Sequence, residues 1–510
     1  MVTQAARRWG DAVAYVAPTG WSPSYAALDR LSDEVAVGLA ARGIGEGDVV
    51  GLVLPSIPEY VVAYAAAAKL GAVTAGVNAR LTSTERVTLL ELAEPAVVVA
   101  TPELAPSRGE VVAIDPASDD GECLRELRAP GGARGDPTPP ALAEDPDRPV
   151  AIVFTSGTTG LPKGAVYAGR QLDAITRVDT GWRWGGGAPA LAATTFAHLG
   201  PMTKLPGVLL RGGTTYLLER WRAAEAIALI ARHRMPGFGG IPTQVALMLA
   251  EPSFADHDLS SVQALVVGGG PATPALIRRA RTSFGAAVSI RYSCSEAGVG
   301  TGTAPTDPDE DAEVSVGRPQ PGVELQVLDP DDRPVSRGEV GAVCLRSAAT
   351  MTGYWRAPEL SAAAFTPDGA VRTGDLGWVD EAGRLRLVGR AKEMYVRGGE
   401  NVFPMEVEGE LAQHPAVAQV VVVPRAHDVW GEVGVAVLVP RDRSAPPTLA
   451  ALREHAAPRV APFKLPDEVI VVDELPLTPM EKIDRRALAA RLREGWRTDR
   501  RSSSVAPPGT

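Results

Sequence analysis

A run of five apolar residues, 150–154, leads directly into a loop rich in glycine and threonine, residues 155–164. A short apolar run that ends at turn residues is typical of a buried strand. In the loop, hydroxyl side chains alternate with small residues, so N–H and O–H groups can face one anion, and Lys163 adds a positive charge. The loop differs from a Walker A loop, because Pro162 precedes the lysine and no serine or threonine follows it. The pattern predicts a phosphate-binding loop, with a plain Gly/Ser linker as the alternative.

Helix and strand patterns alternate from residue 24 to residue 99 and again from residue 262 to residue 292. This alternation is typical of a parallel sheet with helices on its faces. Short strands separated by turns follow Gly317, and a compact set of strands and helices follows Arg390. We therefore predict an α/β fold class, with a large N-terminal domain of α/β layers plus a β-rich subdomain, and a small α+β C-terminal domain.

With 510 residues the chain is too long for one ordinary core, and the changes of pattern set the expected boundaries. We expect the large domain to span residues 1–390 and the small domain to span residues 391–496. Residues 102–147, rich in Pro, Gly, Asp and Ala, are predicted to form an irregular surface segment. Residues 497–510 consist mostly of Arg, Ser, Pro and Gly and are predicted to form a disordered tail.

The composition is that of a soluble globular protein, with 45% hydrophobic and 22% charged residues. A formal net charge of −10 argues against nucleic acid or an anionic membrane as the main partner. The three widely spaced cysteines form neither a disulfide framework nor a zinc motif. The most apolar stretch, residues 60–77, is interrupted by Lys69, so we expect no integral membrane segment and a cytoplasmic location. Nothing in the composition indicates an oligomeric state.

Basic residues are strongly biased toward arginine, because only six of the 51 are lysines. Biased codon usage alone would explain this. A compact ammonium, however, approaches a phosphate or a carboxylate as a point charge where a guanidinium is too large. Half of the lysines, Lys163, Lys392 and Lys482, lie in the motifs described next, which makes them candidate functional residues.

The loop 155–164 resembles the signature of the adenylate-forming (ANL) superfamily of acyl-CoA synthetases, nonribosomal-peptide adenylation domains and luciferases. Each further motif is weak alone, but the ordered set is specific and spans almost the whole chain. The resemblance implies an AMP-forming acid–thiol ligase that uses ATP, Mg²⁺ and coenzyme A, with a small domain that moves between two poses. The motifs are Tyr292-Ser-Cys-Ser-Glu296, Thr373-Gly-Asp375, Gly389-Arg-Ala-Lys392, Arg397-Gly-Gly-Glu-Asn401 and residues 476–485.

The resemblance implies a nucleotide site built from several motifs. Glu296 would hold a Mg²⁺ ion that bridges ATP phosphates, because hard cations prefer carboxylate oxygens. Asp375 would accept hydrogen bonds from both ribose hydroxyls, although an isolated Thr-Gly-Asp is more often a turn. Ser293 and Ser295 stand where the superfamily usually has Gly and Thr, so a hydroxyl is retained. The full set implied for ATP, with Tyr292 against the adenine, is Thr155, Ser156, Gly157, Thr158, Thr159, Lys163, Gly269, Gly270, Tyr292, Ser295, Asp375 and Arg390.

Lys482 matches the catalytic lysine of the mobile domain, whose ammonium would stabilise charge on the substrate carboxylate and the α-phosphate. Glu481 stands where the superfamily generally has glycine. A carboxylate at that position would pull the ammonium away or raise its pKa. Lys392 matches the hinge about which the small domain turns, although its local sequence alone would assign it as a surface charge.

Residues 194–200 resemble the segment that lines the acyl pocket. They place His198, the second catalytic candidate, near the substrate carboxylate or at the gate of the pocket, although a lone histidine is more often a packed core residue. Ala197 and its neighbours offer no acid to pair an α-amine, which favours a simple carboxylic acid over an amino acid. Gly398 and Gly399 resemble the glycine pair beside the pantetheine tunnel of coenzyme A.

The expected function is that of an ATP-dependent acyl-CoA synthetase that activates a carboxylic acid through an acyl-adenylate. An aliphatic acid is favoured, while branched and aryl acids remain open. One alternative is a stand-alone adenylation enzyme that loads a carrier-protein thiol. The other is a catalytically weak nucleotide-binding homologue, which the unusual Glu481 suggests.

Overall fold

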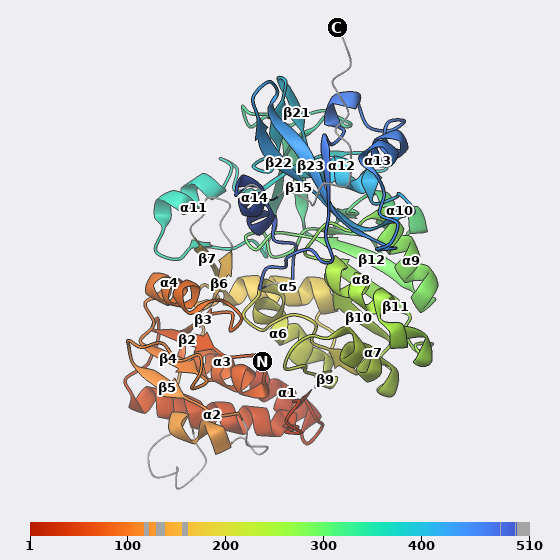
Figure 1. The fold of residues 1–510 in the computed structure, drawn as a ribbon. Helices are drawn as coiled ribbons and strands as arrows, with labels where there is room; N and C mark the ends of the chain where they lie inside the picture. Colours follow the sequence, from red (N-terminus) through yellow and green to blue (C-terminus); the bar gives the residue numbers. More distant parts are fainter. Residues whose placement is uncertain (117–121, 129–137, 156–161, 480, 495, 497–510) are drawn as a thin grey trace.

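The computed structural model describes residues 1–116, 122–128, 138–155, 162–479, 481–494 and 496. Ser156, Gly157, Thr158 and Thr159 of the predicted phosphate loop lie outside the described residues, as does the expected tail 497–510. The described residues form five sheets with helices against them, and the small domain lies above the large one in Figure 1.

The largest sheet has seven strands, and its central strands are parallel and fully buried. Near-continuous runs of valine and alanine form these strands, as expected where helices cover both faces of a parallel sheet. β6 continues into the predicted phosphate loop, and β7 returns antiparallel beside it, pairing Lys163 with Thr155. The sheet order is β17 (Gly353–Tyr354), β7 (Lys163–Ala168), β6 (Pro149–Thr155), β3 (Val73–Gly76), β2 (Val49–Val53), β4 (Val97–Ala100) and β5 (Val111–Ala113).

Two more sheets complete the α/β layers of the large domain. In the five-stranded sheet the first three strands are parallel and the last two antiparallel, in the order β10 (Gly237–Gly240), β11 (Ala264–Gly268), β12 (Ala287–Tyr292), β13 (Thr301–Gly302) and β14 (Arg318–Pro319). The three-stranded sheet joins β1 (Tyr15–Val16), β9 (Thr215–Tyr216) and β8 (Ala190–Leu191).

Antiparallel strands dominate the rest of the chain. The β-rich subdomain is a sheet of β15 (Glu324–Leu328), β16 (Gly341–Arg346), β18 (Val371–Val379) and β19 (Leu385–Arg390). The small domain is built on β21 (Glu400–Val402), β20 (Tyr395–Arg397), β23 (Gly431–Pro440), β22 (Val417–His427) and β24 (Glu468–Val471). Buried side chains pack on both faces of the small sheet, so the small domain has a hydrophobic core of its own.

Several helices begin at residues that cap their first turn. The Ser24 hydroxyl accepts from the backbone of Ala27, and Thr82 forms a capping box with Glu85. The helices of the large domain are α1 (Val2–Trp9), α2 (Tyr25–Ala41), α3 (Pro58–Leu70), α4 (Ser83–Ala93), α5 (Gly169–Thr180), α6 (Leu199–Arg211), α7 (Ala223–Arg232), α8 (Pro242–Ala250), α9 (Pro274–Phe284), α10 (Asp309–Val314) and α11 (Pro358–Ala364). Those of the small domain are α12 (Pro404–Leu411), α13 (Leu449–Ala456) and α14 (Arg485–Arg493).

Short 3₁₀ helices span Glu122–Leu127, Pro252–Asp256 and Pro462–Lys464. The first of them and β5 lie within residues 102–147, so this segment contains more regular structure than its composition predicts. No helix in the described part of the chain combines the length and the apolarity that crossing a lipid bilayer requires.

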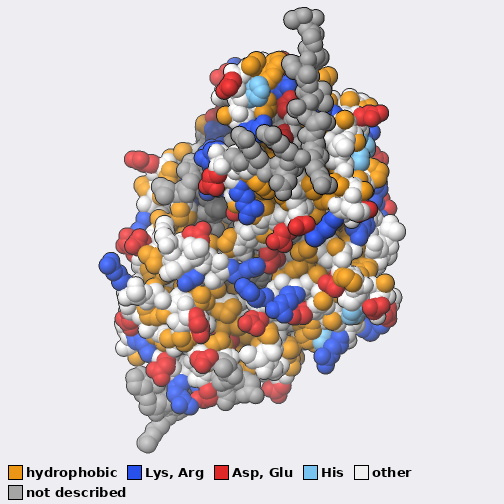
Figure 2. Space-filling view, in the orientation of Figure 1, with side chains coloured by type: hydrophobic (Ala, Val, Ile, Leu, Met, Phe, Trp, Pro, Cys, Tyr) orange, Lys and Arg blue, Asp and Glu red, His pale blue; other side chains and the backbone are white. Residues whose placement is uncertain are grey.

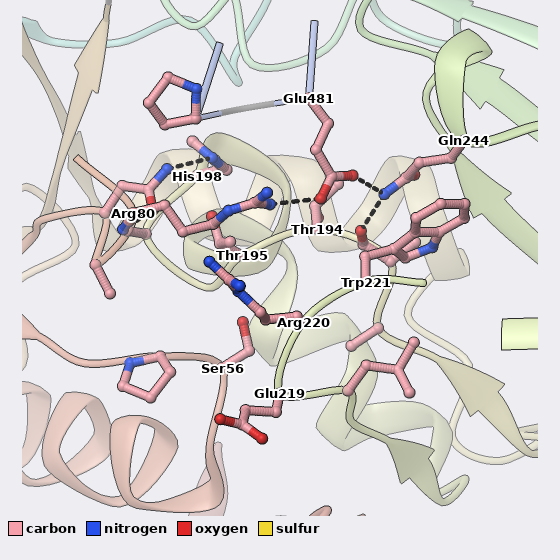
Figure 3. A pocket seen from close by; sticks show the side chains of 18 of the residues that line it. Ser56, Arg80, Thr194, Thr195, His198, Glu219, Arg220, Trp221, Gln244 and Glu481 are labelled. Atoms are coloured by element: carbon pink, nitrogen blue, oxygen red, sulfur yellow. Dashed lines mark hydrogen bonds and ion pairs between the residues drawn. The ribbon is translucent and has the colours of Figure 1, made fainter. Parts of the chain in front are cut away.

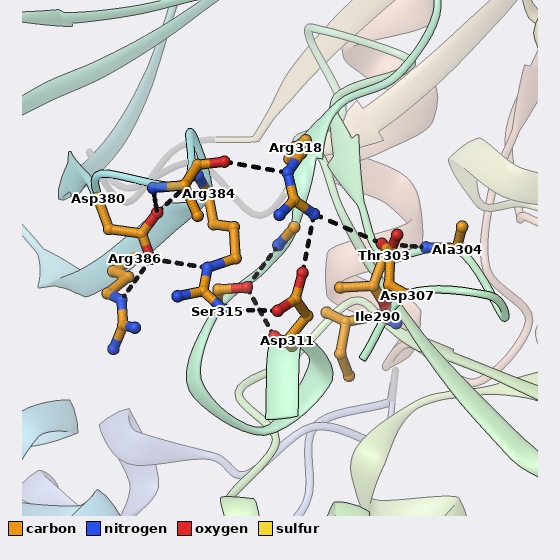
Figure 4. Close-up of polar contacts among 12 residues, drawn as sticks. Ile290, Thr303, Ala304, Asp307, Asp311, Ser315, Arg318, Asp380, Arg384 and Arg386 are labelled. Atoms are coloured by element: carbon orange, nitrogen blue, oxygen red, sulfur yellow. Dashed lines mark hydrogen bonds and ion pairs between the residues drawn. The ribbon is translucent and has the colours of Figure 1, made fainter. Parts of the chain in front are cut away.

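A buried network of charges joins the five-stranded sheet to the β-rich subdomain (Figure 4). The Asp311 carboxylate, at the start of α10, accepts from Arg318 at 2.8 Å and from Arg384 at 2.5 Å. Asp380 accepts from Arg384 at 2.7 Å and from Arg386 at 3.1 Å. Because each buried carboxylate faces two guanidinium groups, the network compensates the cost of removing its charges from water.

The Asp380 carboxyl makes the stability of this junction depend on pH. Burial alone would raise its pKa, but hydrogen bonds from the backbone of Arg384 and from two guanidinium groups outweigh burial and lower the pKa to about 2. The unfolded chain binds the proton near the ordinary value of 3.8, so the carboxylate stabilises the fold above pH 4 by about 2 kcal/mol. That stabilisation is lost as the pH falls from about 4 toward 2.

We therefore expect the free energy of unfolding, measured by urea denaturation, to decrease less between pH 4.5 and pH 3 for the Asp380→Asn variant than for the wild-type protein. The exposed neighbour Glu381 provides the control, because Glu381→Gln should leave the wild-type slope unchanged. Equal slopes in Asp380→Asn and the wild type would contradict the role given to Asp380.

Candidate active site

A tight hairpin carries Lys482 from the small domain to the large one. Leu477 and Ile483 pair across it, and the Glu481 N–H donates to the Thr478 carbonyl at 2.8 Å, which closes the turn. Asp484 then caps α14 by accepting from the backbone of Ala487 at 2.9 Å. In Figure 1 the blue segment before α14 reaches down from the small domain toward α5.

Three of the residues predicted to bind the nucleotide meet at the edge of β12 and β18. The Tyr292 hydroxyl donates to Asp375 Oδ2 at 2.7 Å, and the Arg390 guanidinium lies 3.2 Å from Asp375 Oδ1. Burial and the nearby Asp375 carboxylate raise the pKa of Tyr292 well above its usual value, so the phenol remains protonated and donates. The structure thus brings together an aromatic ring, an acceptor carboxylate and a cation from three separate motifs.

The Lys482 ammonium faces the same cluster. Burial lowers its pKa, the Arg390 cation lowers it further, and the Asp375 carboxylate acts in the opposite direction. The lysine of the small domain therefore lies within electrostatic range of two charged residues of the large domain. The Lys482 ammonium in this cluster favours the binding of a negatively charged ligand.

Glu296 and Lys163 both lie close to Tyr354. The Tyr354 hydroxyl donates to Glu296 Oε1 at 2.8 Å, and the Lys163 ammonium lies 4.8 Å from the centre of the Tyr354 ring. Ser295 directly precedes Glu296, and its carbonyl accepts from the Tyr167 hydroxyl at 2.6 Å. Thr155 and Lys163 of the predicted phosphate loop pair with each other, and Lys163 shares Tyr354 with the carboxylate predicted to hold a metal.

A pocket lies between the Lys482 hairpin and the large domain (Figure 3). The segment that resembles an acyl-pocket wall contributes Thr194, Thr195, Ala197 and His198, and Ile241 extends that side. Figure 2 shows basic side chains gathered near the centre of this face of the molecule, below the small domain. The remaining lining residues are Leu54, Pro55, Ser56, Asn78, Ala79, Arg80, Ala192, Ala193, Leu218, Glu219, Arg220, Trp221, Gln244, Pro479 and Glu481.

His198 is the residue before α6 and lines the pocket, where its side chain is partly buried. Its Nε2 lies 3.4 Å from the side-chain amide nitrogen of Asn78. Burial, the Lys482 ammonium and the Arg80 guanidinium lower the pKa of His198 to about 4, so the imidazole is neutral at pH 7. It can therefore orient a bound group through a hydrogen bond without adding charge.

Glu481 turns away from its neighbour Lys482. Its carboxylate forms an ion pair with Arg80 and accepts from Gln244 Nε2 at 2.8 Å. Among the described residues no ion pair joins Glu481 to Lys482. The carboxylate therefore does not pull the ammonium away, as its position in the sequence had suggested.

The other predicted residues lie farther from this centre. Gly269, with φ of +78°, and Gly270 follow β11 beside Ile241 and Pro242. Gly398 and Gly399 form the turn between β20 and β21, where a Cβ on Gly398 would meet the Trp430 ring at 2.8 Å. Neither glycine of that turn lines the pocket. Lys392 is exposed in the turn that follows β19.

Sequence reasoning missed several side chains at the site. Asn78 and Arg80 directly follow β3, and ligand-binding residues commonly gather at the carboxyl ends of parallel strands. That rule would have selected both residues. Gln244 and Tyr354 come from α8 and β17, and no local pattern distinguishes them from structural residues.

Known proteins resemble this chain over nearly its whole length. A family model described as AMP-binding enzyme matches residues 2–355, and one for the AMP-binding enzyme C-terminal domain matches residues 406–482. The fatty acid–[acyl-carrier-protein] ligase ScoC of Streptomyces coeruleorubidus is 32% identical and covers 92% of both chains. A feruloyl-CoA synthase of an Amycolatopsis species is 33% identical, over 91% of this chain and 93% of its own. The ATP-bound structure of MatB from Rhodopseudomonas palustris superposes with a TM-score of 0.85 at 27% identity, over 97% of this chain and 99% of MatB.

The fold and the clustered motifs are those of an adenylate-forming enzyme of the ANL superfamily. The chain belongs to the AMP-binding enzyme family. The expectations of an α/β fold with a small C-terminal domain, and of an AMP-forming acid–CoA ligase at the level of the family, are thereby confirmed. ATP binding is likewise a property of this family.

Proposed function

We propose that the protein is an ATP-dependent acyl-CoA synthetase that activates an aliphatic carboxylic acid as an acyl-adenylate and transfers the acyl group to coenzyme A. The observation that supports this most strongly is the position of the Lys482 ammonium. It comes from the small domain and lies within electrostatic range of the paired Asp375 and Arg390 of the large domain.

In the first step, a carboxylate oxygen of the acid attacks the α-phosphorus of ATP, and pyrophosphate leaves. Asp375 would accept from the ribose hydroxyls and Tyr292 would lie against the adenine. Lys482 would stabilise the negative charge that is shared between the attacking carboxylate and the α-phosphate. The neutral His198 would orient the carboxylate without competing for it.

Glu296 suits a Mg²⁺ ion that is shared with the nucleotide. The described residues contain no group of three or more His, Cys, Asp and Glu side chains that would enclose a metal. A single carboxylate is nevertheless what Mg²⁺ commonly takes from a protein when phosphates and water supply its other ligands. When bound, the ion would neutralise phosphate charge, while Tyr354 orients the Glu296 carboxylate.

In the second step, the thiol of coenzyme A attacks the acyl carbonyl carbon and AMP leaves. To admit the thiol, we propose that residues 391–496 turn about Lys392 as one domain and withdraw Lys482. The exposed Lys392, directly after β19, tolerates such a change of backbone angles. Gly398 and Gly399 would then line the pantetheine path.

The preference for an aliphatic acid rests on the wall made by residues 192–197 and Ile241. Alanines and threonines predominate there, and the segment carries no acidic side chain that would pair an amino group. The acceptor is the second open choice. We propose coenzyme A rather than a carrier protein, and the similarity to ScoC makes the carrier protein the main alternative.

A screen of AMP release over a graded series of acids tests both choices. We expect ATP-dependent AMP formation with saturated straight-chain acids when free coenzyme A is the acceptor, and weak activity with aryl acids. A phosphopantetheinylated carrier protein is the matched acceptor. Faster turnover with the carrier protein would favour the alternative, and ATP binding without AMP release for any acid would overturn the proposal.

A further inference from the structure

The backbone of Glu481 has a strained conformation that a glutamate seldom adopts. Its φ of +60° lies in the left-handed region, which costs a residue with a Cβ about 1 kcal/mol or more and which glycine adopts freely. Glycine is also what the superfamily generally has at this position. Strain at a residue that glycine would relieve points to a function for the side chain.

That side chain is held by two donors on separate elements of the large domain. Arg80 follows β3, and its backbone N–H donates to Asn78 Oδ1 at 2.9 Å. Gln244 belongs to α8, and besides Glu481 its Nε2 donates to the Ala193 carbonyl at 2.7 Å, while its Oε1 accepts from the backbone of Ile241 at 3.1 Å. The Gln244 side chain is thus held by bonds within the large domain, and the backbone of Arg80 is held by Asn78.

The environment strengthens this contact. The Glu481 side chain is 13% exposed and that of Arg80 is 37% exposed, so the ion pair is partly shielded from water. A charge-assisted bond to a preorganised donor is stronger and more directional than an exposed surface pair. The dashed lines in Figure 3 show Arg80 and Gln244 converging on the one carboxylate.

We propose that Glu481 is a positioning residue for the adenylation step. Its carboxylate, held by Arg80 and Gln244, locks the hairpin in the pose in which Lys482 reaches Asp375 and Arg390, and it releases when the small domain turns for the thiol step. We call this three-residue contact the hairpin clamp. The inference rests on the proposed two-step reaction for its catalytic consequence, but the clamp itself is a property of the ligand-free protein.

The hairpin clamp should favour the adenylation half-reaction and should not favour the thioester-forming half-reaction. We expect Glu481→Gln and Glu481→Gly to slow acid-dependent ATP–pyrophosphate exchange by about tenfold or more, because Lys482 is then less often in place. Thioester formation from supplied acyl-adenylate and coenzyme A should be unchanged or faster. Glu474→Gln, which alters an exposed carboxylate of the same segment, is the control and should leave both half-reactions as in the wild type.

Charge-reversal variants distinguish the loss of a positioning contact from a general disruption of the structure. Arg80→Glu should lower exchange further than Arg80→Gln, and the double variant Arg80→Glu with Glu481→Arg should recover part of the loss. Thermal unfolding identifies any variant that fails to fold. An equal loss in both half-reactions, or wild-type exchange in the folded Glu481→Gln and Glu481→Gly variants, would overturn the proposal.

Hydrogen exchange in the ligand-free protein tests the clamp independently of activity. The amides of Glu481 and Lys482 donate within the hairpin, to Thr478, and should lose protection in Glu481→Gln but not in Glu474→Gln. Unchanged protection would reject the clamp even if the enzyme is an acyl-CoA synthetase. A wild-type enzyme that shows no exchange with any acid, but with protection lost in Glu481→Gln, would instead reject the proposed function.

Discussion

Replacing Lys482 with alanine should lower acid-dependent ATP–pyrophosphate exchange by about 10²–10³-fold, which is typical for removal of one preorganised donor to a developing charge. The ammonium lies within electrostatic range of Asp375 and Arg390, so its loss would remove the cation that the small domain contributes to the proposed nucleotide site. Conversion of supplied acyl-adenylate and coenzyme A to thioester should continue, because we propose that the lysine has withdrawn before that step. Radiolabel exchange and a thioester assay measure the two rates separately.

Lys204 provides the matched control for this substitution. Its exposed ammonium pairs with Asp179 at 3.1 Å on the surface of α6 and takes no part in the pocket. Lys204→Ala should therefore retain wild-type rates in both assays. Exchange at the wild-type rate in folded Lys482→Ala would show that the lysine has a different role.

Replacing Asp311 with asparagine should destabilise the protein by about 3 kcal/mol or more. The Asp311 side chain is 4% exposed and receives guanidinium groups from Arg318 and Arg384. The amide has almost the same shape, but it lacks the charge and turns one acceptor into a donor that faces a cation. The measurement is the urea midpoint of the first unfolding transition, because a chain with several domains need not unfold in one step.

Asp309 is the control for Asp311, since it lies two residues away in the same helix, α10. Its side chain is 71% exposed and pairs with Arg281 at 3.1 Å at the surface. Asp309→Asn should change stability by less than about 0.5 kcal/mol. If the two substitutions cost the same, the buried network would not be what joins the five-stranded sheet to the β-rich subdomain.

The sequence predicted the regular elements well where periodicity and capping agree. The pattern of residues 274–284 predicts a helix with the bounds that α9 has. The helix predicted over residues 24–41 forms as α2, with Ser24 as its capping residue rather than its first residue. The ends of strands are predicted less accurately: the apolar run 417–423 predicts a strand with those bounds, but β22 continues four residues further, to His427. The reason is that β23 pairs along its whole length, and a strand's pairing partner is invisible in its own sequence.

The residues of the candidate site likewise include some that the sequence predicted and some that it did not. Tyr292, Asp375, Arg390 and Lys482 were selected by motif, and the structure brings them together. The direction of the Glu481 side chain was not predictable, because Arg80 lies 401 residues away along the chain and only the folded hairpin brings the two into contact. Residues 156–159 stay a prediction, since they lie outside the described residues.

Tyr354 has a further consequence for the protein before any ligand arrives. Its ring lies against the Lys163 ammonium and its hydroxyl donates to the Glu296 carboxylate, and no salt bridge among the described residues joins the two charges. If the two opposite charges formed an ion pair, they would neutralise each other, and a ligand would have to break that pair in order to bind. Tyr354 instead contacts both charged groups while they remain unpaired with each other. A ligand can therefore bind them without first breaking an ion pair between Lys163 and Glu296.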